Sequence, residues 1–260
     1  MPLNAQQSVW PYPRMIAHRG AGLYAPENTL AAMRYGARCG CKMFEYDVKL
    51  SRDKVAILLH DDTLDRTSNA VGRANEFDFA QLSEFDFGSW HSADYVGEPI
   101  PTLACIANFT IGKQLHSNIE IKPNVGWERQ TGHWVAIQAR RLWHNAQLPP
   151  LLSSFSIEAL EAAAQAAPEL PRALLIEHPI NEVAVLMQQM HALGCVGLNI
   201  DYRLLTAELL AACQAAGFFV CVWTVNEAEQ IAALFAQGVD AVITDEVHFS
   251  PTDWGAHGMP

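Results

Sequence analysis

The sequence predicts an α/β protein, specifically a closed (β/α)8 TIM barrel. Short apolar runs alternate with longer helical patterns through almost the whole chain, which is typical of right-handed βαβ units with a parallel sheet. The number of strand-like runs is near eight, and the length of 260 residues matches the roughly 250 residues of a barrel. An open, doubly wound sheet is the alternative, but no G-x-G-x-x-G sequence follows the first predicted strand.

Local sequence signals place the elements of the first half. The cluster Pro26-Glu27-Asn28-Thr29 is typical of a helix start, and Gly36 and Gly40 lie near the end of the same pattern. The expected elements are strands at 15–17, 42–50, 55–59 and 117–122, and helices at 28–38 and 132–143.

The second half is more regular. Pro168, Gly217 and Gly238 each stand at the end of a helical pattern, where helix-breaking residues are common. The expected elements are strands at 151–155, 172–177, 195–201, 218–225 and 240–245, and helices at 157–167, 181–193, 206–216 and 227–237.

The segment 61–101 interrupts the alternation and is too long for a plain connection. We expect a single domain over 1–260, with a small insertion subdomain at about 61–101 over the end of the barrel that carries the sites. A flexible surface excursion is the less favoured alternative, because several large apolar side chains there need burial: Phe77, Phe79, Leu82, Phe85, Phe87 and Trp90.

Composition restricts the function. The net charge of −11 argues against a nucleic-acid partner, because phosphate backbones are bound through basic surfaces. The amino terminus has no apolar stretch of signal-peptide length, and the longest apolar runs are far shorter than the ~20 residues of a membrane helix. We therefore expect a cytoplasmic protein with a small-molecule substrate and no membrane partner; its oligomeric state is left open.

Side chains that could bind a ligand or take part in catalysis follow the first predicted strands. His18 and Arg19 come directly after the first strand, Glu45 and Asp47 lie near the end of the second, and His60 follows the extended run beside it. Residues two apart on a strand share a face, so Glu45 and Asp47 point together. Because sites in barrels lie at the carboxyl ends of the strands, we expect these groups to converge at the barrel mouth.

Glu120 and Lys122 end the next barrel strand and share a face in the same way. Three carboxylates at one mouth would raise each other's pKa unless a cation neutralised them. Oxygen ligands without a nearby cysteine suit one hard divalent cation, Mg²⁺ first, with Ca²⁺ or Mn²⁺ as alternatives. Taken alone, Glu45 and Asp47 would be interpreted as solvated surface charges, but the presence of Glu120 and the two histidines at the same mouth favours a metal site.

Simpler roles exist for the other groups as well. A lone histidine after a strand often caps a loop, Arg19 could only pair with a carboxylate, and Lys122 could only neutralise Glu120. Trp223 follows a strand and could present an aromatic wall to a polyol, although a core tryptophan is equally compatible with that position.

These motifs, in this order, resemble the glycerophosphodiester phosphodiesterase family, in particular its short bacterial cytoplasmic type associated with glycerol phosphate uptake. An isolated His-Arg or Glu-x-Asp would be weak evidence, whereas the ordered set covers nearly the whole chain. The motifs that carry the resemblance include His18-Arg19-Gly20, Pro26-Glu27-Asn28-Thr29, Glu45-Tyr46-Asp47, His60-Asp61, Asp65-Arg66-Thr67, Glu120-Ile121-Lys122, Ser153-Ser154-Phe155, Trp223-Thr224-Val225-Asn226 and Ile243-Thr244-Asp245.

The resemblance implies a TIM barrel with a small insertion between the second strand and the second helix. It also implies metal-dependent hydrolysis of glycerophosphodiesters, such as glycerophosphocholine or glycerophosphoethanolamine, to sn-glycerol 3-phosphate and an alcohol. A short tail after Asp245, with little sign of a full eighth helix, departs from the expected barrel. The implied roles are metal ligation by Glu45, Asp47 and Glu120, acid/base catalysis by His18 and His60, and phosphate binding by Arg19 and Lys122.

Two rival functions fit the sequence less well. Metal-dependent barrels that hydrolyse amides usually have His-x-His after the first strand, whereas Arg19 follows His18 here. A non-catalytic barrel that binds phosphorylated ligands would not require two histidines beside three carboxylates. Lysophospholipids are alternative substrates, less favoured because the amino terminus shows no membrane-binding helix. The residues leave open which histidine is the acid and whether water or a glycerol hydroxyl attacks.

Overall fold

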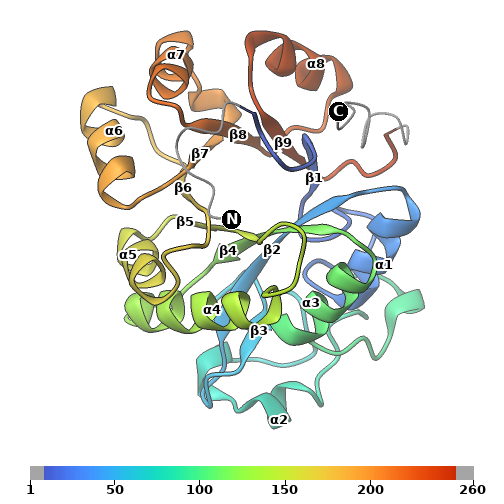
Figure 1. Ribbon diagram of the computed structural model, residues 1–260. Helices are drawn as coiled ribbons and strands as arrows, with labels where there is room; N and C mark the ends of the chain where they lie inside the picture. Colours follow the sequence, from blue (N-terminus) through green and yellow to red (C-terminus); the bar gives the residue numbers. More distant parts are fainter. Residues whose placement is uncertain (1–8, 250–260) are drawn as a thin grey trace.

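A computed structural model describes residues 9–249 of the chain (Figure 1). Among these residues are nine strands, and all except the antiparallel β3 form a closed parallel ring. The ring closes because β1 (Met15–Ala17) pairs with both β2 (Met43–Leu50) and β9 (Ala241–Thr244). The predicted TIM barrel is confirmed. Its other strands are β4 (His116–Ile121), β5 (Leu151–Ser154), β6 (Arg172–Ile176), β7 (Gly197–Asp201) and β8 (Phe219–Trp223).

Helices cover the outside of the ring (Figure 1). Several of them begin with a hydroxyl side chain that accepts a hydrogen bond from a backbone N–H in the first turn, as Thr29 does from Ala32. Within 9–249, no helix combines the length and the apolar character needed to cross a bilayer. The outer helices are α1 (Leu30–Arg38), α3 (Leu103–Gly112), α4 (Glu128–Leu142), α5 (Ile157–Ala166), α6 (Val183–Ala192), α7 (Ala207–Ala215) and α8 (Ala228–Gln237).

The helix α3 is an element that the sequence pattern did not predict. Its residues are mostly apolar, so they show no clear polar face, and the helix contacts α1, α4, β3 and β4. Thr102, whose side chain accepts from the backbone N–H of Cys105, was the available signal for its start. After β9 no helix occurs through Phe249, and the tail from 250 onwards lies outside the described residues.

Alternate side chains on β2 face opposite environments. Phe44, Tyr46 and Val48 pack outward in the main core between the strands and the helices, whereas Met43 lies in a second apolar cluster inside the ring. Trp10 and Tyr12 pack against this inner cluster, and the Tyr12 hydroxyl donates to the Pro149 carbonyl at 3.0 Å. The inside of the ring is therefore apolar at this end, and the polar inward side chains of β2 lie further along the strand.

The chain between β3 (Ala56–Leu58) and α3 forms a segment with its own small core, drawn in blue-green to teal at the lower edge of Figure 1. It contains the short helix α2 (Phe79–Leu82) and two 3-10 turns, η1 (Ala74–Glu76) and η2 (Ala93–Tyr95). Trp90 differs from the expectation of burial, because it is 38% exposed and its indole N–H donates to the Phe87 carbonyl. The buried or partly buried residues include Leu64, Phe77, Phe79, Leu82, Phe85, Phe87 and Ile100.

Candidate active site

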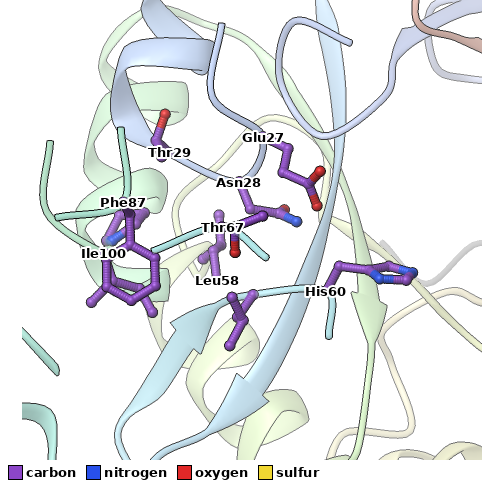
Figure 2. Close-up of a pocket in the computed structure, with 10 residues that line it drawn as sticks. Glu27, Asn28, Thr29, Leu58, His60, Thr67, Phe87 and Ile100 are labelled. Atoms are coloured by element: carbon purple, nitrogen blue, oxygen red, sulfur yellow. The ribbon is translucent and has the colours of Figure 1, made fainter. Parts of the chain in front are cut away.

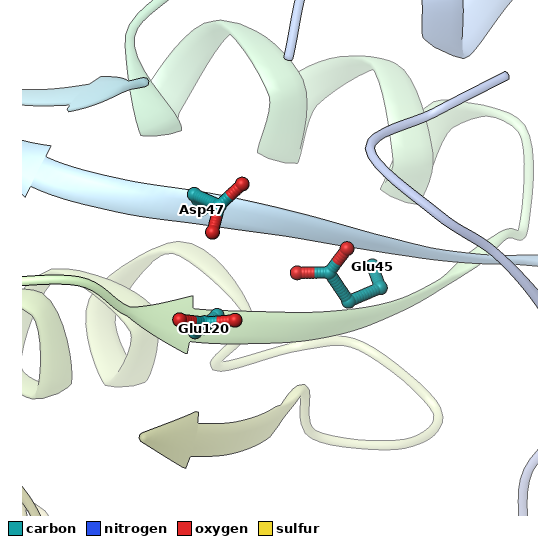
Figure 3. Close-up of side chains that lie close together, drawn as sticks. All are labelled: Glu45, Asp47 and Glu120. Atoms are coloured by element: carbon teal, nitrogen blue, oxygen red, sulfur yellow. The ribbon is translucent and has the colours of Figure 1, made fainter. Parts of the chain in front are cut away.

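Three carboxylates converge inside the mouth of the barrel (Figure 3). Glu45 and Asp47 lie on β2, and Glu120 lies on β4 directly opposite Asp47 in the strand register. Each offers an oxygen atom, and these atoms all lie within 4.8 Å of one another. All three residues are buried. Strand alternation and parallel register therefore suffice to bring the three groups together.

The three carboxylates differ in their electrostatic environment. Burial raises the pKa of Glu45 well above its usual value, and the Asp47 and Glu120 carboxylates raise it further. Burial and Asp47 likewise raise the pKa of Glu120 to about 7. Burial also acts on Asp47, but nearby positive charges, above all Arg19, outweigh it and lower the pKa to about 2. The nearby cations therefore offset the effect of burial on the pKa of Asp47, but not its effect on the pKa of Glu45 and Glu120.

Two cations border the cluster. Arg19 has a positive φ of 50°; its backbone N–H donates to Glu45 Oε2 at 3.2 Å, and its Nε lies 3.5 Å from Asp47 Oδ2. Lys122 Nζ donates to Glu120 Oε1 at 2.8 Å and lies 3.9 Å from Asp47 Oδ1. Both cations therefore lie where an anion placed against the carboxylate cluster would also contact them.

His18 is oriented by a carboxylate from the far end of the chain. Its Nδ1 lies 2.7 Å from Asp245 Oδ1, and its Nε2 lies 3.8 Å from Glu45 Oε2. A carboxylate only accepts hydrogen bonds, so Asp245 selects the tautomer with the proton on Nδ1 and leaves Nε2 toward the cluster. Gly22 permits this contact, because a Cβ at that position would collide with the backbone of Asp245.

His60 is held in a corresponding way from the other side. Its Nδ1 lies 2.7 Å from Asp61 Oδ1, and both oxygens of Asp61 accept from Arg66. Arg66 also donates to both oxygens of Glu27, at 2.6 and 2.8 Å. Buried Lys49 donates to the His60 carbonyl at 3.1 Å, which fixes the backbone of the same loop. These bonds give His60 a defined orientation.

Glu27 joins the two sides of the site. Its Oε1 accepts from Arg19 Nη1 at 2.8 Å as well as from Arg66, so one carboxylate positions both guanidinium groups. Glu27 and His60 also line a small cavity with an empty volume of about 210 Å³ (Figure 2). The cavity has an apolar side that includes Leu58 and Phe87. The segment after β3 therefore contributes to the surroundings of His60.

Trp223 ends β8 and lies beside the same mouth. Its ring packs edge-on against Phe155, with 5.7 Å between the ring centres, and Lys122 Nζ lies 5.0 Å from the centre of the Phe155 ring. The indole Nε1 is buried and has no hydrogen-bond partner among residues 9–249. The aromatic pair thus lies next to Lys122, and the indole N–H of Trp223 is a buried donor beside it.

The structure brings all the predicted site residues to one end of the barrel: His18 and Arg19 after β1, Glu45 and Asp47 on β2, His60 after β3, Glu120 and Lys122 at the end of β4, and Trp223 at the end of β8. The positioning residues around them were not assigned from the sequence, although they lie in motifs already noted there. Asn28 is one of them: its amide donates to Asp47 Oδ2 at 2.8 Å, and its carbonyl oxygen accepts from the Asp47 N–H. The others are Glu27, Asp61, Arg66 and Asp245.

Comparisons with known proteins identify the family of this chain. The family model described as "Glycerophosphoryl diester phosphodiesterase family" matches residues 18–248. YhdW of Bacillus subtilis is 31% identical over 248 residues, which are 94% of this chain and 98% of YhdW. A glycerophosphodiester phosphodiesterase of Caldanaerobacter subterraneus is 31% identical over 89% of this chain and 93% of its own length.

A solved structure extends the likeness to three dimensions. The phosphodiesterase of Oleispira antarctica, in complex with the product sn-glycerol-3-phosphate, superposes with a TM-score of 0.85 and 31% identity. The match covers 95% of this chain and 97% of that one. The barrel, the site geometry and these matches together show that the chain belongs to the glycerophosphoryl diester phosphodiesterase family and is a phosphoric diester hydrolase.

Proposed function

We propose that this enzyme hydrolyses water-soluble glycerophosphodiesters, such as glycerophosphocholine or glycerophosphoethanolamine, to sn-glycerol 3-phosphate and an alcohol. The observation that carries the proposal is the cluster of three buried carboxylates flanked by Arg19 and Lys122 and by carboxylate-oriented histidines. The complex of the Oleispira antarctica relative with sn-glycerol-3-phosphate supports the same product.

The residues present fit one divalent cation. Glu45, Asp47 and Glu120 supply only oxygen atoms, and Glu45 Oε1 is buried without a hydrogen-bond partner in the part of the chain that the structure describes. A cation there would satisfy that oxygen, and its charge would offset both the burial and the carboxylate repulsion that raise the pKa of Glu45 and Glu120. Hard oxygen ligands favour Mg²⁺, with Ca²⁺ and Mn²⁺ as alternatives. When bound, the ion supplies Lewis-acid stabilisation of charge on the phosphoryl oxygens.

Arg19 and Lys122 bind and orient the diester. Each already lies beside carboxylates of the cluster, so their positive charges are held in place before a substrate arrives. The planar guanidinium of Arg19 can donate two parallel hydrogen bonds to a phosphate, and the ammonium of Lys122 adds a third donor. Donors that are fixed in advance stabilise the developing negative charge without reorganisation.

His18 and His60 move the protons. One imidazole takes the proton from the nucleophile, which is water or a glycerol hydroxyl, and the other donates a proton to the departing alkoxide. Each ring is held through Nδ1 by a carboxylate, Asp245 for His18 and Asp61 for His60, so Nε2 is the atom available for transfer. Trp223, with its unpaired Nε1, provides the wall and a donor for the glycerol part.

Turnover of glycerophosphocholine tests the acid/base pair. His18→Ala and His60→Ala should each lower kcat by roughly 10²–10⁴, while His133→Ala, an exposed histidine on α4, should leave it unchanged. Near-normal turnover in both site variants would refute the pair. Wild-type activity should vanish in EDTA and return with Mg²⁺, and Glu45→Gln should no longer show that response.

A separate pair of variants tests the aromatic wall. Trp223→Ala should raise KM more than it lowers kcat, because the ring binds the substrate without taking part in proton transfer. Trp134→Ala, which removes a half-exposed tryptophan on α4, is the matched control. An unaltered KM in Trp223→Ala would remove this residue from the site.

A further inference from the structure

A second, larger cavity lies where β6 leads into α6. It has an empty volume of about 1050 Å³, part of it open to solvent. The end of β6, the connecting loop and the first turns of α6 form its wall, and we call it the β6–α6 cavity. Leu175 and Leu186 are buried, whereas Val185 is 55% exposed. Its apolar wall residues include Leu175, Ile176, Pro179, Ile180, Val185 and Leu186.

Phe155 connects this cavity with the phosphate side of the site. The Phe155 ring lines the cavity, and its centre lies 5.0 Å from Lys122 Nζ. The same ring contacts Trp223 edge-on. The β6–α6 cavity therefore begins one side chain away from the ammonium group that is proposed to hold the phosphate. A diester bound there has one of its two arms within reach of the cavity.

The charges on the cavity wall have one sign. Glu177 and Glu182 line it and are both exposed, and none of its lining residues within 9–249 is lysine or arginine. The remaining ionisable lining residue, His178, lies 3.7 Å from Glu177 through its Nε2. Such a wall attracts a cation and repels an anion. Its apolar remainder suits methyl and methylene groups better than a chain of hydroxyls, which would need hydrogen-bond partners.

We propose that the β6–α6 cavity receives the alcohol arm of the diester and selects an alcohol that carries an ammonium group on a short hydrocarbon, as choline and ethanolamine do. The inference rests on the proposed phosphodiesterase function and adds the residues that set its preference. Glu177 and Glu182 supply the attraction for the ammonium group, and the apolar wall together with the Phe155 ring accommodates its carbon atoms.

Paired substrates measure this preference without depending on absolute activity. We compare kcat/KM for glycerophosphocholine with kcat/KM for glycerophosphoglycerol, whose alcohol is neutral, at saturating Mg²⁺. The interaction energy of an exposed charge pair is modest. The double variant Glu177→Gln/Glu182→Gln should therefore lower the ratio about 5- to 20-fold, mainly by raising KM for the cationic substrate. Added salt should lower the wild-type ratio in the same direction.

The matched control is Glu208→Gln with Glu229→Gln. These glutamates lie in the first turns of α7 and α8, so the same charge is removed from neighbouring helices that do not line the cavity. The control should leave the ratio within about twofold of the wild-type value. Tetramethylammonium should inhibit wild-type turnover competitively and should inhibit the Glu177/Glu182 variant more weakly.

The outcomes separate this inference from the function on which it rests. An unchanged ratio in the Glu177/Glu182 variant, or an equal change in the control, would overturn the assignment of the cavity while wild-type hydrolysis of both diesters upheld the function. A wild-type enzyme that hydrolysed neither diester would overturn the function, and this inference with it. A Val185→Lys variant gives an independent check, since one positive charge added to the wall should also lower the ratio, and an unchanged or raised ratio would overturn the assignment of the cavity.

Discussion

Replacing Asp245 with asparagine should separate the orientation of His18 from its chemistry. In the wild type, Asp245 Oδ1 lies 2.7 Å from His18 Nδ1, and Oδ2 accepts from the Asn226 amide at 3.3 Å. The oxygen of the new amide should remain toward Asn226, so its NH₂ group would turn toward His18 Nδ1. That donor favours the tautomer with the proton on Nε2, so Nε2 cannot take up a proton, and it also disfavours the imidazolium form, in which Nδ1 must donate.

The size of the effect follows from the lost contact. A hydrogen bond to a charged group contributes about 1.5–3 kcal/mol, and about 1.4 kcal/mol corresponds to a tenfold change in rate. Asp245→Asn should therefore lower kcat about 10- to 150-fold. The effect on KM should be small, because Asp245 does not contact the cations that are proposed to bind phosphate.

The assay is release of sn-glycerol 3-phosphate from glycerophosphocholine at saturating Mg²⁺, together with the ¹⁵N spectrum of the His18 ring. Glu246→Gln is the matched control, because it removes the adjacent carboxylate, which accepts from the Tyr24 hydroxyl and not from His18. A kcat for Asp245→Asn within twofold of this control, or an unchanged ring tautomer, would refute the orienting role of Asp245.

Arg66→Met should lower kcat about tenfold or more, because Arg66 donates hydrogen bonds to both oxygens of the Asp61 carboxylate that orients His60. Arg66→Lys should restore part of the lost kcat. The control is Arg52→Met, which breaks an exposed ion pair with Asp78 and should leave kcat unchanged. Without divalent cation, the free energy of unfolding should fall by on the order of 3 kcal/mol as the pH rises from 4.5 to about 7. Burial raises the pKa of Glu120 to about 7 in the folded state, so the folded protein loses stability as Glu120 loses its proton over this range. Urea titrations in EDTA and in Mg²⁺ check this, and a flat or rising stability in EDTA would contradict it. Arg172→Met should lower the free energy of unfolding by about 2–4 kcal/mol and leave kcat unchanged. The reason is that the buried guanidinium of Arg172 donates hydrogen bonds to the carbonyls of Leu170, Leu193 and Gly194. The denaturant midpoints of the variant and the wild type measure this loss of stability.

The geometry of the carboxylate cluster could be predicted because it depends on short-range rules. Glu45 and Asp47 share a face as a result of the strand period of two, and Glu120 ends the neighbouring parallel strand. The helix α3 could not be predicted in the same way, because apolar residues cover most of its surface and leave no periodic signal. Its contacts with α1, α4 and β3 supply the burial that the pattern did not reveal.

The alternation of strands and helices and the positions of the reactive groups at strand ends can be inferred from the chain alone, because hydrophobic periodicity and capping act between residues a few positions apart. The orientation of those groups depends on contacts between distant segments. The contact of His18 with Asp245 spans 227 residues and exists because β1 pairs with β9 when the ring closes. The bonds from Arg66 to Glu27, and the cavity between Phe155 and α6, also depend on which distant segments the closed barrel brings side by side.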